Sequence, residues 1–186
     1  MTDESYHTLL SVEAVAMTKS FRGLNIIVPE FNLIKYMKNM QTNYHNELDK
    51  IVVLLGTATV SELFISDYLK LLSSDYTIQP INRLTVDTHR IDELAHAGIF
   101  KRLICIIYQC LPIAQQQLFI MILRNATKWF ADPELEIWSS ILEQLGINYY
   151  PQIISECRFI NAHKFKIDYS AIDRLVLELI SNKQIA

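Results

Sequence analysis

The sequence predicts an all-α fold, a compact bundle of about seven to nine helices around a central hydrophobic helical hairpin. Hydrophobic residues make up 51% of the 186 residues, and they recur at three- and four-residue steps along much of the chain. There are only four glycines and five prolines, so tight turns are few and a β-sandwich or barrel is disfavoured. We expect a single helical domain over residues 1–186, with room for a short β element at residues 24–28, 51–55 or 77–86.

The N-terminal half is predicted to hold three helices. The first covers residues 4–21, and the second covers residues 29–48, whose apolar residues form one stripe. Residues 50–55 are ambiguous between a strand and a buried helical turn. The third helix covers residues 59–72, because Thr59-Val60-Ser61-Glu62 fits the capping-box pattern, in which the hydroxyl and the carboxylate satisfy each other's backbone amides.

The middle of the chain is predicted to hold a loop over residues 76–87, a short helix over residues 89–96 and the central hairpin. The hairpin consists of Ile99–Leu111 and Ile113–Phe130, joined at Pro112, and both segments are apolar on most sides. The run Gln115-Gln116-Gln117 indicates that the end of the hairpin near Pro112 is exposed. The four glycines, at positions 23, 56, 98 and 146, are interpreted as the ends of helices.

Three further features predict the C-terminal helices. Asp132-Pro133-Glu134 is typical of a helix start, with Asp as N-cap and Pro at the first helical position, and Gly146 would end that helix. Residues 149–159 are predicted to form another helix. Asp168 or Ser170 is predicted to cap the last one, residues 169–182.

The stretch GTATVSELFISDYLKLL, residues 56–72, poses the choice between a DNA-reading helix and a core helix. A helix-turn-helix has an aliphatic residue six positions after its turn glycine, where this chain has Glu62, and Lys70 is the only base in the candidate helix. The formal net charge is −3, which gives no footprint for nucleic acid. We therefore expect a capped core helix.

One helix face carries potential metal ligands. His89, Glu93 and His96 are spaced i, i+4, i+7, and imidazole and carboxylate groups together could hold a divalent metal ion. Glu93 and His96 form a Glu-x-x-His pair, which di-metal bundles use twice together with two further glutamates. A second pair, Glu4 and His7, lies in a terminal segment that we expect to be frayed, and no inward glutamate completes the set. A solvated polar face is therefore preferred, and no metal or other cofactor is expected.

Other signs of catalysis are missing from the sequence. It has no Gly-x-Ser-x-Gly turn and no glycine-rich phosphate loop. The three cysteines lie in apolar segments and are expected to be buried, reduced thiols in a cytoplasmic protein: Cys105, Cys110 and Cys157. The N-terminus has no basic region before an apolar run, and no apolar span reaches 18 residues, so we expect neither a secretory signal nor a membrane helix.

We therefore expect a non-catalytic protein-interaction module with no catalytic residues, acting as an adaptor, chaperone or assembly protein. The alternative is a transcription regulator with a helical dimerisation or sensor domain. Its partner is expected to be another protein or a second copy of the chain. Trp129 and Phe130, at the far end of the hairpin, are the predicted protein-contact residues, because aromatic side chains are enriched at interfaces.

Overall fold

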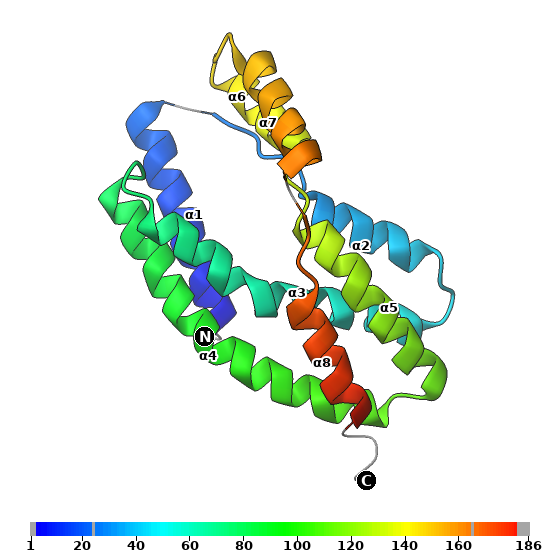
Figure 1. Ribbon diagram of the computed structural model, residues 1–186. Coiled ribbons are helices and arrows are strands. Elements are labelled where there is room, and N and C mark those ends of the chain that lie inside the picture. Colours follow the sequence, from blue (N-terminus) through cyan, green and yellow to red (C-terminus); the bar gives the residue numbers. More distant parts are fainter. Residues whose placement is uncertain (1–2, 24, 165, 182–186) are drawn as a thin grey trace. The chain divides into compact units, whose positions relative to one another are not determined.

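The computed structural model describes residues 3–23, 25–164 and 166–181, and this part of the chain is all-α (Figure 1). It contains eight helices and no strand. The helices are α1 (Asp3–Arg22), α2 (Asn32–Thr42), α3 (Glu47–Ser74), α4 (Pro80–Cys110), α5 (Ile113–Phe130), α6 (Leu135–Gln144), α7 (Tyr150–Lys164) and α8 (Ser170–Ser181). The predicted all-α class is confirmed. No β element forms in the described residues, since residues 51–55 and 80–86 are helical.

The chain divides into two compact units, and each is discontinuous in sequence. Unit 1 comprises Met1–Asn25 and Ser61–Leu103, and unit 2 comprises Ile26–Val60 and Ile104–Ala186. Helices α3 and α4 contribute residues to both units, because the boundaries between residues 60 and 61 and between residues 103 and 104 fall inside them. The expectation of one domain stays a prediction.

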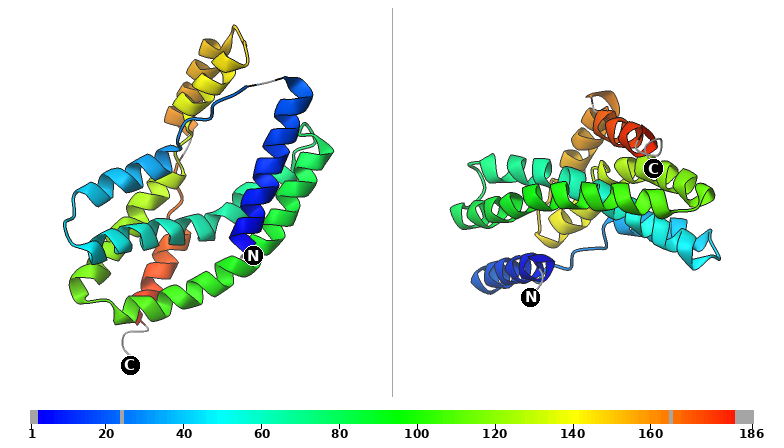
Figure 2. Two further views of the ribbon diagram at one scale, coloured as in Figure 1. Left: turned by 180° about the vertical axis from the view of Figure 1, so that it is seen from behind. Right: turned by 90° about the horizontal axis from the view of Figure 1, so that it is seen from below.

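Unit 2 has α5 at its centre, in contact with α2 and α8 (Figures 1 and 2). The side chains of Phe119, Ile122 and Leu123 are at most 1% exposed. Gly56 lies against Ile122 and Phe119, because a Cβ at this position would stand 2.6 Å from Ile122 Cγ2 and 3.7 Å from Phe119 Cδ2. The glycine therefore lets the N-terminal part of α3 approach α5 closely.

Two of the four glycines do not end helices, which corrects the prediction. Gly56 and Gly98 lie inside α3 and α4, so each helix is continuous where the sequence suggested separate elements. Gly23 and Gly146 follow α1 and α6 as predicted, with φ of +61° and +70°. These two positions need the left-handed conformation that glycine adopts without strain.

The predicted caps at Thr59 and Asp132 are also wrong. Thr59 is in the middle of α3, where its Oγ1 donates a hydrogen bond of 2.7 Å to the Leu55 carbonyl. The helix already runs before Thr59, so there are no orphan amides for it to cap. Asp132 instead accepts a bond from the backbone N–H of Glu134, and Glu134, with φ of 53°, is the N-cap of α6.

Glu134 also accepts the first backbone N–H of α2 through its side chain. The backbone N–H of Asn32 donates to both carboxylate oxygens of Glu134, at 2.8 and 3.1 Å, whereas Phe31, the N-cap of α2, makes no side-chain capping bond. This contact between segments far apart in sequence explains why α2 begins at Asn32 and not at Pro29. Burial raises the pKa of the Glu134 carboxyl, and the bond from Asn32 opposes that rise.

The hairpin turn between α4 and α5 lies at Leu111 and Pro112, as predicted. Gln116 is nevertheless 5% exposed, and its amide donates to the carbonyls of Tyr108 and Leu111, both at 2.9 Å. The glutamine run therefore does not mark a uniformly exposed end, because a glutamine that satisfies the turn's carbonyls can be buried.

The cysteines differ from the expected buried thiols. Cys110 and Cys157 are exposed, Cys105 is half-buried, and none of the three forms a disulfide bond. Within the residues that the structure describes, no helix combines the length and the hydropathy needed to cross a membrane.

Candidate metal centre

Five potential metal ligands from three helices of unit 1 come together. They are His7 from α1, Glu62 from α3, and His89, Glu93 and His96 from α4. They form two overlapping groups, His7/His89/Glu93 and Glu62/Glu93/His96, and in each group the candidate ligand atoms lie within 4.8 Å of one another. Glu93 belongs to both groups and is therefore the centre of the cluster.

The hairpin formed by α3 and α4 explains how Glu62 meets Glu93. Glu62 lies 12 residues before the end of α3 at Ser74, and Glu93 lies 13 residues after the start of α4 at Pro80. Helical residues rise 1.5 Å each, so both side chains are about 20 Å from the turn. On α4, His89, Glu93 and His96 share one face because of their i, i+4, i+7 spacing.

Three imidazoles surround the Glu93 carboxylate. Nε2 of His89 is 2.8 Å and Nδ1 of His7 is 3.3 Å from Oε1, while Nδ1 of His96 is 3.5 Å from Oε2. Two ligand atoms that are each about 2.1 Å from one metal ion lie about 3.0 Å apart at a right angle and about 3.4 Å apart at the tetrahedral angle. The two longer separations match the spacing of atoms that share an ion, and the shortest is that of a hydrogen bond.

Burial of the Glu93 carboxylate costs free energy unless a positive charge or hydrogen bonds compensate for it. The side chains of His7 and Glu93 are each 4% exposed. A buried carboxylate is stable only when a cation or several hydrogen bonds compensate for its lost hydration. Neutral imidazole nitrogens and carboxylate oxygens are also the donors that first-row divalent metals prefer. The residues present therefore fit a metal ion.

His7 has a second acidic neighbour. Its Nε2 lies 3.2 Å from Oδ2 of Asp92, which precedes Glu93 on α4 and is 44% exposed. Its ring also packs against the ring of His89, with centroids 4.0 Å apart and the ring planes tilted by 40°. His7 is thus held on several sides by α4, and the expectation that this terminal segment is frayed is wrong for His7.

Comparison with known proteins identifies the family. The family model described as P-aminobenzoate N-oxygenase AurF matches residues 1–179. The chain belongs to the AurF family. It is also 26% identical over 160 residues to the 4-aminobenzoate N-oxygenase of Streptomyces thioluteus, an alignment that covers 85% of this chain and 48% of that protein. The chain therefore spans about half the length of this relative.

Membership of the AurF family corrects the functional prediction. A non-catalytic adaptor, chaperone or assembly protein was expected, with a transcription regulator as the alternative, whereas the family is named for an oxygenase. The expectation failed because it relied on short local motifs. Three of the five potential ligands share α4, but Glu62 and His7 lie on other helices, and no local motif in the sequence connects them to these three.

Sequence reasoning found part of the cluster that this AurF family member contains. His89, Glu93 and His96 do share a face as predicted, and His7 joins them. Glu62 was missed because it was assigned to a capping box, and the argument that no inward glutamate exists is therefore wrong. Glu62 and Glu93 lie at nearly equal distances from the turn at residues 75–79 that joins α3 and α4, and this is the signal that would have paired them. The side chain of Glu4 lies outside the residues whose side chains the structure describes.

The predicted contact residues lie in unit 2, at the end of α5. Trp129 and Phe130 are half-buried, and the Trp129 ring lies near Tyr36 of α2, with centroids 6.2 Å apart. This packing accounts for at least part of the burial of Trp129. Docking of a partner or a second copy at these residues stays a prediction.

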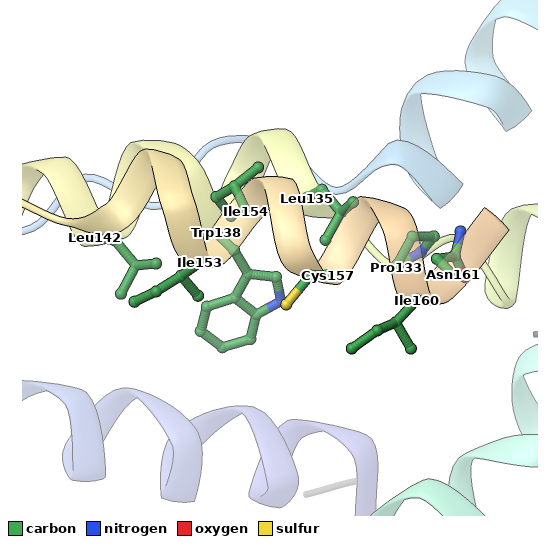
Figure 3. Close-up of a pocket in the computed structure, with 9 residues that line it drawn as sticks. All are labelled: Pro133, Leu135, Trp138, Leu142, Ile153, Ile154, Cys157, Ile160 and Asn161. Carbon is green, nitrogen blue, oxygen red and sulfur yellow. The ribbon is translucent and has the colours of Figure 1, made fainter. Parts of the chain in front are cut away.

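Unit 2 also contains an apolar pocket between α6 and α7, with a volume of about 480 Å³ (Figure 3). It is lined by Pro133, Leu135, Trp138, Leu142, Ile153, Ile154, Cys157, Ile160 and Asn161. Among these residues, only Asn161, Cys157 and the indole N–H of Trp138 bring polar side-chain atoms, and none carries a charge. A small-molecule site needs a few placed polar groups for orientation, so this pocket has no evident anchor for a charged ligand.

Proposed function

We propose that this chain carries out metal-dependent N-oxygenation of an aromatic amine, with the metal held by His7, Glu62, His89, Glu93 and His96. The single observation that carries the proposal is the buried Glu93 carboxylate, which two groups of potential ligands share. The matching family and the relative that acts on 4-aminobenzoate support the reaction type.

The donor set favours iron or manganese and two ion positions. Ferritin-like di-iron and di-manganese proteins take a Glu-x-x-His pair from each of two helices and one Glu from each of two others. Glu93 and His96 on α4 are one such pair, Glu4 and His7 fit the second by their sequence spacing, and Glu62 on α3 supplies a single glutamate. His89 adds a nitrogen donor to this pattern. Glu93, which both groups share, would contribute to holding an ion at either position.

The overall reaction places one atom of O₂ into an N–H bond of the amine and releases the other as water. It consumes two electrons and two protons from an external reductant. The bound metal would supply the ability to activate O₂, which amino-acid side chains lack. The carboxylates contribute negative charge that favours higher oxidation states, and the imidazoles contribute neutral donors. The burial of Glu93 and His7 keeps bulk water away from that part of the centre.

The first experiment measures metal. The full chain is purified without added metal and then loaded anaerobically with Fe²⁺ or Mn²⁺, and bound metal is quantified by mass spectrometry. We expect up to two ions per chain. Glu93→Gln, which removes the charge shared by both groups at nearly constant volume, should abolish most of this binding.

A control substitution on α4 shows whether the loss of metal binding is specific to the cluster or follows from the removal of any carboxylate. Asp87 is paired with Arg90 at 2.9 Å and belongs to neither ligand group, so Asp87→Asn should bind metal as the wild type does. Equal metal content in the wild type and Glu93→Gln, or no binding in either, would contradict the metal centre.

The second experiment measures the reaction. The iron- or manganese-loaded chain is incubated with 4-aminobenzoate, O₂ and a chemical reductant, and oxygenated products are detected by mass spectrometry with ¹⁸O₂. Incorporation of the label at nitrogen supports the proposal. A chain that binds metal stoichiometrically and incorporates no label into any of a panel of aromatic amines would refute the assigned reaction while leaving the metal centre intact.

A further inference from the structure

The pocket between α6 and α7 lies in unit 2 and takes no part in the proposed metal centre. Its lining residues stand at three successive levels along the two helices: Leu142 with Ile153, Trp138 with Cys157, and Leu135 with Ile160 (Figure 3). Within each pair, both residues are nearly equally far from the turn at residues 145–149 that joins the helices. Because residues three or four positions apart share a helix face, the three pairs form one continuous trough.

This trough is narrow. Its outer levels, at Leu135 and Leu142, are seven residues apart on α6, which is about 10 Å along a helix axis. A volume of about 480 Å³ divided by that length gives a mean cross-section of about 50 Å². A helix with its side chains is about 10–12 Å wide, which is about 80–110 Å² in cross-section, so a helix of a partner protein does not fit inside. An extended aliphatic chain is slimmer and contacts all three levels.

The lining of the trough carries no charge. All nine lining residues are uncharged, and two charged neighbours of the lining in sequence, Arg158 and Glu136, pair with each other at 2.7 Å. A charged group that entered the trough would lose its hydration without gaining a partner. The amide of Asn161 lies at the end of the trough beside Pro133 (Figure 3), and an amide both donates and accepts hydrogen bonds.

We propose that this trough binds a free, uncharged amphiphile, with its aliphatic chain along the three levels and a hydroxyl or amide head at Asn161. The volume falls within the range of small-molecule sites, about 300–1,000 Å³. Trp138 and Ile160 are 50% and 51% exposed, and a bound chain removes this apolar surface from water. The ligand gains its affinity from this burial, and Asn161 sets the direction in which it lies. The site is independent of the proposed metal centre.

The reactivity of two cysteines tests the site within one protein. Cys157 is on the middle level of the trough and exposed, whereas Cys110 is exposed on α4 and does not line the pocket. The full chain is alkylated with iodoacetamide at increasing concentrations of decanol, and mass spectrometry follows each thiol. At a decanol concentration ten times Kd the unliganded fraction is about one eleventh, so Cys157 should react about 10-fold more slowly and Cys110 at an unchanged rate.

The length of the chain provides a second measurement. In a series from hexanol to dodecanol, each added methylene should tighten binding by about 3- to 4-fold while it is buried in the trough. The affinity should then level off, because a chain longer than the trough leaves its end in water. Asn161→Ala should weaken decanol binding by about 2- to 10-fold, which is the effect of losing one hydrogen bond.

Two neighbouring positions on α7 provide a variant and its matched control. Ile160→Asp puts a carboxylate into the wall of the trough at a half-exposed position and should abolish the protection of Cys157. Phe159 is 61% exposed and does not line the pocket, so Phe159→Asp should leave the protection unchanged. Circular dichroism checks that both variants fold. If Ile160→Asp unfolds, Trp138→Ser takes its place, with the same expected loss.

The outcomes separate this ligand from other occupants. Absence of protection by any alcohol, or equal protection in Ile160→Asp and Phe159→Asp, overturns the proposal. Decanoate that binds as tightly as decanol overturns the uncharged head. Protection by phosphatidylcholine vesicles and not by decanol assigns the trough to a membrane surface, and protection by raised protein concentration alone assigns it to a second copy, so both overturn the proposal. Protection by decanol that Ile160→Asp removes and Phe159→Asp retains confirms it.

Discussion

Replacing Gly56 by alanine tests the close packing of α3 against α5. The added Cβ would stand 2.6 Å from Ile122 Cγ2 and 3.1 Å from Ile122 Cβ, distances that require the backbone or Ile122 to move. Overpacking of this kind costs about 1–3 kcal/mol. Alanine in place of glycine inside a helix gains about 1 kcal/mol. We therefore expect Gly56→Ala to lower the free energy of unfolding by about 1 kcal/mol.

Gly98→Ala is a matched control for this substitution. Gly98 also lies inside a helix, and a Cβ added there would meet no neighbouring atom within 4 Å among the described residues. It should gain the helix-propensity term alone, about 0.5–1 kcal/mol. The difference between the free energies of unfolding of the two variants removes the contribution of helix propensity and leaves the steric cost, about 1–3 kcal/mol. Urea unfolding followed by circular dichroism measures both free energies.

The contact with Ile122 can be tested as the cause of the destabilisation by Gly56→Ala. Ile122→Ala removes the Cγ2 methyl group, so in that background Gly56→Ala should become neutral or stabilising, like Gly98→Ala. If Gly56→Ala stabilises the otherwise wild-type protein as much as Gly98→Ala does, the close approach of α3 and α5 is refuted.

Three further substitutions test contacts in unit 2. Glu134→Ala should cost about 1 kcal/mol by removing the carboxylate that accepts the first backbone N–H of α2, which chemical denaturation would measure. The bond from the Ser170 N–H lowers the pKa of Asp168 below its ordinary 3.8. The bond therefore stabilises the fold above pH 3.8, and this stabilisation is lost as the pH falls through the lowered pKa of Asp168. The stability of Asp168→Ala should change less than that of the wild type on acidification. Trp129→Ala should cost at least about 1 kcal/mol by removing the ring beside Tyr36, and sedimentation of this variant tests the predicted docking: unchanged association would assign Trp129 to the core alone.

Much of the fold could be predicted from the sequence, because helical periodicity is a local property. The hairpin turn at Pro112 and the helix ends at Gly23 and Gly146 follow from local chemistry. Gly56 could not be interpreted correctly in the same way, since a glycine that ends a helix and one that admits a neighbouring side chain look alike in sequence. The Ile122 methyl group that decides between them is 66 positions away.

The candidate site was predictable only where its residues share one helix. The i, i+4, i+7 spacing of His89, Glu93 and His96 places them on one face without any tertiary information. Placing Glu62 beside Glu93 requires the continuous α3 and α4, and both were predicted as broken. Asp92 directly precedes Glu93 in the sequence, but its contact with His7 depends on α1 and could not be predicted locally.

The separation of His7 from the rest of its cluster has a consequence for biosynthesis. His7 and Asp92 are 85 positions apart, and ribosomes add about 5–20 residues per second. The histidine of α1 therefore exists for about 4–17 s before its partners on α4 are made. During that interval, no complete set of donors competes for ions in the cell. If the proposed metal centre forms, the metal would be selected only after α4 has been synthesised, from the ions that the chain meets from then on.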